Sequence, residues 1–266
     1  MGNILSWLAA PVFAAAAASA LPPKDNVRLE LPILVSEAAD AVPEETSTGA
    51  MFGAQQARYR SVATIAHDLK LADGTLLLAA GTRLFEHRAA GASFKGPVYC
   101  RLVKPKKMAA LLCLADQDGN AGFDTLWEGN AVVARSDRLA PALPYPDAKR
   151  VALTFDPIGY QIGPPEAEEA LQLGFCISGS NPLLGQHHFY EALGTADAPI
   201  AITGTHRAVR FSGGPARIEI AGAVIEASKL GKKRYSVRVI KPLEAGEHVL
   251  VEQYQIEQRI LFIPRG

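Results

Sequence analysis

Apolar and polar residues alternate one by one in several segments of the second half of the chain. In 253–262, one face carries Tyr254, Ile256, Ile260 and Phe262. The same period of two recurs in Arg217–Ile220 and Tyr235–Ile240. A β-strand places alternate side chains on opposite faces, whereas a helix requires a period near 3.6. With shorter β-type runs between turn residues over 58–139, the sequence predicts a mainly β fold. We expect antiparallel sheets, sandwich or barrel-like, in two subdomains, with little helix outside the N-terminal segment.

The composition indicates a folded chain without a charge bias. Of its 266 residues, 48% are apolar and 20% are charged, which is enough apolar material for a sizeable core. The 27 basic and 27 acidic side chains leave no net charge. Nucleic-acid binders and proteins attracted to anionic membranes usually carry excess positive charge. We therefore expect no nucleic-acid partner.

The N-terminal segment has the pattern of an export signal. No charged residue precedes Lys24, and an apolar run over 4–18 ends in Ala18-Ser19-Ala20, the small residues that signal peptidase requires. The basic residue usually found before the apolar run is absent. A retained membrane anchor and lipidation at Gly2 are the alternatives. We expect a signal peptide over 1–20, a periplasmic or extracellular location, and no transmembrane segment after cleavage.

The stretch that follows is polar and rich in proline. Residues 21–57 mix Pro, Glu, Ser and Thr, a composition typical of a tether. Val27–Val35 is the one strand candidate in it. Because Pro32 has no N–H to donate to a ladder, we expect this strand to lie at a sheet edge or to contain a bulge.

A second proline-rich stretch divides the rest of the chain. Pro141, Pro144 and Pro146 disfavour both helix and ladder pairing, which predicts a linker over 141–149. It would separate a β subdomain at 58–140 from another at 150–266. A short helix is expected at Pro164–Leu171, because prolines and then glutamates open that segment.

One polar segment has the spacing of a calcium loop. Its candidate ligands alternate along the chain: Asp116, Asp118, Asn120, Gly122 and Asp124. This spacing resembles the calcium loops of EF-hand and dockerin proteins, which implies oxygen coordination of Ca²⁺. The segment departs from that pattern at position 6, which holds Ala121, and at position 12, where Trp127 replaces the bidentate acid. A polar turn without metal is the alternative.

The six histidines have no spacing that demands a metal. They are His67, His87, His187, His188, His206 and His248. Side chains of adjacent strand residues point to opposite faces, so His187 and His188 are unsuited to one ion. Either one, with His206 and Asp156, is a candidate metal or hydrolytic site. The chain contains no Walker loop, dinucleotide-binding motif or H-E-x-x-H motif, so no catalytic residue is assigned.

Two of the three cysteines are predicted to form a disulfide. Pro97–Val103 and Met108–Leu114 are β-type runs joined by a short charged turn. A hairpin centred between Lys106 and Lys107 places Cys100 opposite Cys113, within the distance that a disulfide accepts. Export would favour oxidation. Cys176 is left as a buried free thiol.

Together these features predict an exported cell-envelope or periplasmic β protein that acts by binding or as a structural element rather than as an enzyme. A secreted or periplasmic hydrolase using His187 or His188 with Asp156 is the alternative. A subunit that pairs edge strands with an envelope partner is a third option. The expected partner is an envelope protein or surface component of unknown identity. The only cofactor with any sequence support is calcium.

Overall fold

The computed structural model describes residues 26–39, 42–71, 73–90, 96–105, 109–133, 142–151, 155–166, 171–181, 185–195 and 198–252. These residues form strands and no helix, so the mainly β prediction is confirmed. The predicted signal peptide at 1–20 and the alternating segment at 253–262 lie outside the described residues. In the segment expected to be helical, 164–166 are irregular and Leu171 begins a strand, while 167–170 are outside the described part.

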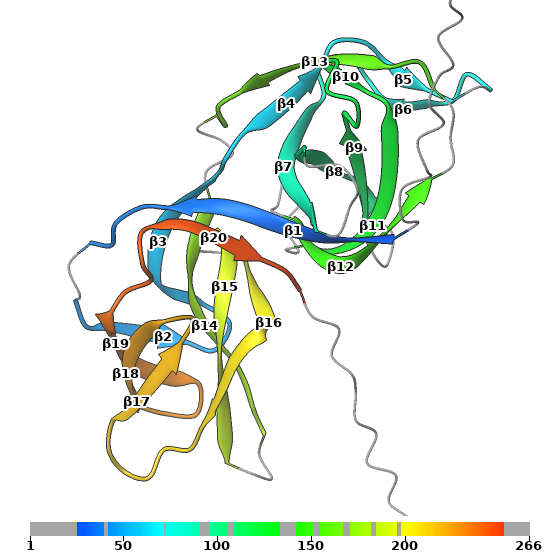
Figure 1. Ribbon diagram of the computed structural model, residues 1–266. Helices are drawn as coiled ribbons and strands as arrows, with labels where there is room; N and C mark the ends of the chain where they lie inside the picture. Colours follow the sequence, from blue (N-terminus) through cyan, green and yellow to red (C-terminus); the bar gives the residue numbers. More distant parts are fainter. Residues whose placement is uncertain are drawn as a thin grey trace, which may run out of the picture.

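Six strands close into a barrel, seen in the upper half of Figure 1. In order around the ring they are β1 (Asn26–Val35), β7 (Arg83–Ala90), β8 (Val98–Pro105), β9 (Ala109–Ala115), β11 (Thr125–Val133) and β12 (Ala142–Val151). Every neighbouring pair is antiparallel, and β12 pairs back onto β1. One hydrophobic cluster fills the barrel interior. Its buried residues come from five of the strands and include Leu29, Cys100, Cys113, Trp127 and Ala148, while the half-buried Ala89 of β7 packs against it.

Shorter strands cover one side of the barrel. They are β4 (Val62–Ile65), β5 (Leu69–Lys70), β6 (Leu76–Leu78), β10 (Gly122–Phe123) and β13 (Ile158–Gly163). Strand β4 pairs with β7 and with β13, and β13 pairs with β10. Their apolar side chains pack on outward-facing barrel residues in a second cluster that contains Ile65, Tyr99, Leu114, Phe123 and Leu126.

The lower half of the molecule is a β-sandwich (Figure 1). One sheet contains the second half of β1 with β3 (Met51–Tyr59), β14 (Leu171–Asn181), β15 (Gln186–Thr195), β16 (Ala198–Val209) and β20 (Gly246–Leu250). The other contains β2 (Glu44–Ser47), β17 (Ala216–Ile220), β18 (Ala223–Lys229) and β19 (Arg234–Lys241). The largest core cluster joins Phe52, Phe175 and Phe189 of the first sheet to Ile225 and Tyr235 of the second.

The segment expected to be a tether is part of the folded body. It contains β1, β2 and most of β3, and β1 is shared by the barrel and the sandwich rather than lying at an edge. Strand β1 tolerates Pro32 because the strand changes pairing partners at this residue. On one side pairing with β7 ends at Glu30 and pairing with β3 begins at Ile33, so Pro32 is paired only with Val249 of β20.

The stretch expected to be a linker at 141–149 is likewise a strand. Most of it is β12, which pairs with both β1 and β11. The register with β11 shifts between Gly129, opposite Ala148, and Ala131, opposite Pro144, so Pro146 lies inside a bulge. A bulge is one of the few places where a sheet accommodates proline. The two lobes consequently do not follow chain order, since β2 and β3 precede the barrel strands but belong to the sandwich.

Candidate functional site

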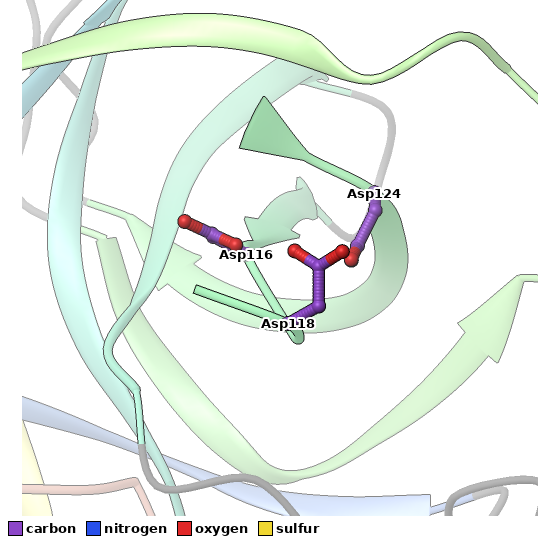
Figure 2. Close-up of side chains that lie close together, drawn as sticks. All are labelled: Asp116, Asp118 and Asp124. Atoms are coloured by element: carbon purple, nitrogen blue, oxygen red, sulfur yellow. The ribbon is translucent and has the colours of Figure 1, made fainter. Parts of the chain in front are cut away.

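The described residues bring three aspartates together in the turn that follows β9. Asp116, Asp118 and Asp124 each place a carboxylate oxygen within 4.8 Å of the others (Figure 2). Asp118 is exposed, and the other two are half-buried. Three converging carboxylates in one short turn repel one another unless a cation or hydrogen-bond donors balance their charge. Hydrogen-bond donors surround two of the three carboxylates closely.

Backbone amides hold these carboxylates in place. Asp116 Oδ1 accepts hydrogen bonds from the N–H groups of Gly119 and Asn120, at 2.8 and 3.1 Å, and its Oδ2 accepts one from Ala121 N–H at 2.9 Å. Asp124 Oδ1 accepts from Gln117 N–H at 3.1 Å. The first carboxylate therefore organises the turn from within. Both oxygens of Asp116 accept two hydrogen bonds each, the second one on Oδ2 coming from the Tyr160 hydroxyl, so the lone pairs left for a cation among the described residues are on Asp118 and on Asp124 Oδ2.

Ala121 adopts the backbone conformation that the calcium-loop pattern assigns to glycine. Its φ is +65°, in the left-handed region, and it occupies position 6 of the loop. The glycine of this segment, Gly122, comes one position later, where it begins β10 and pairs with Gly159 of β13. The substitution at position 6 thus leaves the turn geometry in place but introduces a strained residue.

The twelfth position of the loop offers no ligand. Trp127 is fully buried in the barrel interior, paired with Cys113 of β9, and Glu128 on the next position is exposed on the other face of β11. A Ca²⁺ ion normally takes about six to eight oxygens, two of them from the acid at this position. The turn can therefore supply only part of a calcium coordination shell.

Tyr160 of β13 joins the aspartate turn to the covering strands. Its hydroxyl donates to Asp116 Oδ2 at 3.0 Å, and its ring stacks on Phe123 with 4.0 Å between ring centroids. Burial, together with the hydrogen bond and charge of Asp116, raises the pKa of Tyr160 to about 12. The phenol therefore stays protonated and remains a hydrogen-bond donor. No local pattern in the sequence points to this residue, because it lies 44 positions from Asp116.

The structure separates the predicted histidine group. His187 is buried in the sandwich core, where its Nδ1 lies 2.8 Å from the Tyr235 hydroxyl. His188 points to the opposite face of β15 and lies beside His206 of β16. Asp156 belongs to the connection between β12 and β13 in the barrel lobe. Among the described residues, the aspartate turn is the sole group of three or more His, Cys, Asp or Glu side chains close enough to share an ion.

The cysteine prediction is confirmed in full. Cys100 and Cys113 form a disulfide, and Cys176 is a buried free thiol. No membrane-spanning helix is found in the part of the chain that the structure describes.

A groove of about 750 Å³ lies in the sandwich lobe. Its apolar lining includes Val42, Val239 and Leu243, and Glu37 and Glu44 contribute carboxylates. Sequence reasoning missed it because the lining comes from three segments that are far apart in the chain.

Comparison of the chain with known protein families, with curated proteins and with solved structures finds no match.

Proposed function

We propose that the protein is an exported β protein of the cell envelope or periplasm with a binding or structural role, and that its Asp116–Asp124 turn takes up calcium. The convergence of Asp116, Asp118 and Asp124 carries this proposal. Carboxylate oxygens are the hard ligands that Ca²⁺ prefers, and extracellular calcium modules function with weak, millimolar-range sites. The missing acid at position 12 places this turn in that weak class.

Export is supported by the disulfide inside the barrel. Cys100 and Cys113 are both completely buried, and disulfides of this kind persist in oxidising compartments rather than in the cytosol. The apolar N-terminal segment supplies the targeting signal in this proposal, with the mature chain beginning at Leu21. N-terminal sequencing of protein from an exporting host tests it. Recovery of intact Met1 in the soluble extracytoplasmic fraction would contradict it.

The burial and hydrogen bonding of His187 favour a binding or structural role over catalysis. A hydrolase that uses His187 or His188 with Asp156 remains the alternative function. It has less support because His187 is hydrogen-bonded to Tyr235 within a packed aromatic core. His188 lies on the opposite face of β15, so the two histidines cannot act together. A general base needs access to substrate, which this packing denies to His187.

Calcium uptake is tested by thermal unfolding in excess Ca²⁺ and in excess chelator. We expect Ca²⁺ to raise the melting temperature of the unmodified protein, because an ion that binds only the folded state stabilises it. Asp118→Asn should abolish this rise. Asp118 is the right position because it is exposed and accepts its hydrogen bonds from Asn120, only two residues away.

The matched control is Asp73→Asn. Asp73 is also exposed in a tight turn, where it accepts a hydrogen bond from Thr75 N–H, but it belongs to no group of three or more His, Cys, Asp or Glu side chains among the described residues. This variant should keep the calcium response. A melting temperature of the unmodified protein that is indifferent to calcium and chelator would overturn the calcium proposal.

A further inference from the structure

Histidine, tyrosine and sulfur-containing side chains lie together on the face of the larger sandwich sheet that is opposite to its core-facing side. Four residues that are direct cross-strand partners form a row over β3, β14, β15 and β16: Met51, Cys176, Tyr190 and His206. His188 lies on the same face of β15, two residues before Tyr190. This group is separate from the aspartate turn, which lies in the barrel lobe, and its donors are of a different chemical class.

His188 and His206 are neighbours across the β15–β16 ladder. His206 is opposite Tyr190, and His188 is opposite Ala208, so the two histidines are diagonal partners, within reach of each other's side chains. Their ring centroids are 6.0 Å apart. Because a metal–imidazole bond is about 2.0–2.1 Å long, two imidazoles that share one ion have ring centres roughly 5–6.5 Å apart. The observed separation falls in that range.

Hydrogen bonding and packing prepare His206 as a ligand. Its Nδ1 lies 3.1 Å from the Thr203 carbonyl oxygen, an acceptor only, so Nδ1 carries the proton and Nε2 presents its lone pair. This is the usual second interaction of a metal-binding histidine, which orients the ring and raises its basicity. Tyr190 stacks on the ring at a centroid distance of 5.7 Å and limits its rotation. His206 is exposed, so the lone pair is open to an ion from solution.

His188 contributes a second nitrogen without a competing partner. Its Nδ1 is buried and has no hydrogen-bond partner among the described residues. Because burial closes Nδ1 to solvent, Nε2 is the nitrogen of this ring that can bind an ion. His187 cannot be the second ligand, because it faces the core and is hydrogen-bonded to Tyr235.

We propose that His188 and His206 form a two-histidine site for a late first-row divalent cation, with Cu²⁺ bound most tightly. Neutral imidazole suits Cu²⁺, Ni²⁺ and Zn²⁺, and affinity within this series is highest for Cu²⁺. Ca²⁺ prefers oxygen ligands and is expected at the aspartate turn instead. Water or an external ligand fills the remaining coordination positions. The site does not depend on the proposed function.

The test is a Cu²⁺ titration of the metal-free full-length protein against a chromophoric chelator, with electron paramagnetic resonance of the bound copper. We expect one tight equivalent whose spectrum shows coupling to two imidazole nitrogens. His188→Ala and His206→Ala should each weaken this binding at least tenfold and reduce the nitrogen coupling. Both side chains lie outside the apolar core clusters, and circular dichroism checks that the variants keep their strand content.

His67→Ala is the matched control, because His67 is exposed on the barrel lobe and should leave copper affinity unchanged. Asp118→Asn should also retain copper binding, while His206→Ala should retain any calcium response. The copper proposal and the calcium proposal can therefore be contradicted separately. Equal copper affinity in the unmodified protein and both histidine variants would overturn the proposal. So would the absence of a tight equivalent in the unmodified protein.

Discussion

Cys100 on β8 lies directly opposite Cys113 on β9, with 4.0 Å between their Cα atoms, and the disulfide that joins them points into the barrel. On its other side, Cys113 pairs with Trp127 of β11. The cross-link therefore fixes the register of one hairpin at the centre of the closed ring. Its residues also form part of the barrel core.

Removing this disulfide should destabilise the protein without changing its topology. For a loop closed over 13 positions, the lost constraint on the unfolded chain is worth about 3 kcal/mol. The double variant Cys100→Ala/Cys113→Ala should lower the free energy of unfolding by at least this amount, as measured by urea denaturation. It should also make that free energy insensitive to reductant.

Cys176→Ala provides the control, since this buried thiol is free. It should cost less than the double variant and retain the dependence on reductant. A stability of the unmodified protein that is the same with and without reductant would show that the disulfide contributes little.

Replacing Ala121 by glycine should stabilise the aspartate turn. At φ +65° alanine is strained by about 1–2 kcal/mol, whereas glycine adopts this conformation freely. The greater freedom of glycine in the unfolded chain offsets part of the gain, so we expect a net stabilisation of about 0.5–1 kcal/mol. Chemical denaturation of Ala121→Gly measures it.

Ala80→Gly distinguishes relief of strain from a general effect of glycine. Ala80 is exposed in a turn and has no positive φ, so glycine there should be neutral or destabilising. Equal changes in the two variants would mean that Ala121 is not strained.

Local patterns in the sequence predicted the hairpin and the placement of His187 and His188 on opposite faces of one strand. The register that pairs Cys100 with Cys113 follows from turn length, and the separation of His187 from His188 follows from strand alternation. Both depend on residues close together in the chain. The position of Pro32 inside a shared strand could not be predicted in this way. It depends on where the pairing of β1 with β7 ends and its pairing with β3 begins, and both partners are distant in the chain. The hydrogen bond from Tyr160 to Asp116 is equally non-local.

A close backbone approach between β3 and β14 gives a further prediction. A methyl group on Gly174 would lie 2.9 Å from the Phe52 carbonyl oxygen and 3.0 Å from Ala54 Cα, where the register of the two strands shifts. Backbone atoms cannot move aside easily, so Gly174→Ala should cost about 1–3 kcal/mol of unfolding free energy. Thermal and chemical denaturation should agree on the loss.

Gly163→Ala is the comparison for this variant. Gly163 also lies in a strand, but open space surrounds its Cα where a methyl group would be placed. We expect little change in stability. A Gly174→Ala protein as stable as Gly163→Ala would contradict the tight contact.

The stability of the fold should fall in mild acid because of His87. This side chain is buried in β7 at 2% exposure, and its Nε2 has no hydrogen-bond partner among the described residues. Burial lowers the pKa of His87 to about 4, despite a hydrogen bond between its Nδ1 and the Phe85 carbonyl. The imidazole is consequently neutral in the folded protein at neutral pH.

In the unfolded chain the same imidazole titrates near pH 6.5. Between about pH 6.5 and 4 the unfolded state therefore binds a proton that the folded state does not, and stability falls as the pH falls. Over the whole window the loss from His87 is roughly 3 kcal/mol. His87→Leu should remove this part of the pH dependence, as measured by urea denaturation at a series of pH values.

Other groups titrate in the same window, so the comparison must be between matched variants. Burial also lowers the pKa of His187, which adds a loss of the same sign in every variant that retains it. His67→Leu serves as the control, since His67 is exposed, and its pH profile should match that of the unmodified protein. The expected result is a shallower fall in stability for His87→Leu alone. If both variants lost stability equally between pH 6.5 and 4, a buried neutral His87 would not be the cause of the acid sensitivity.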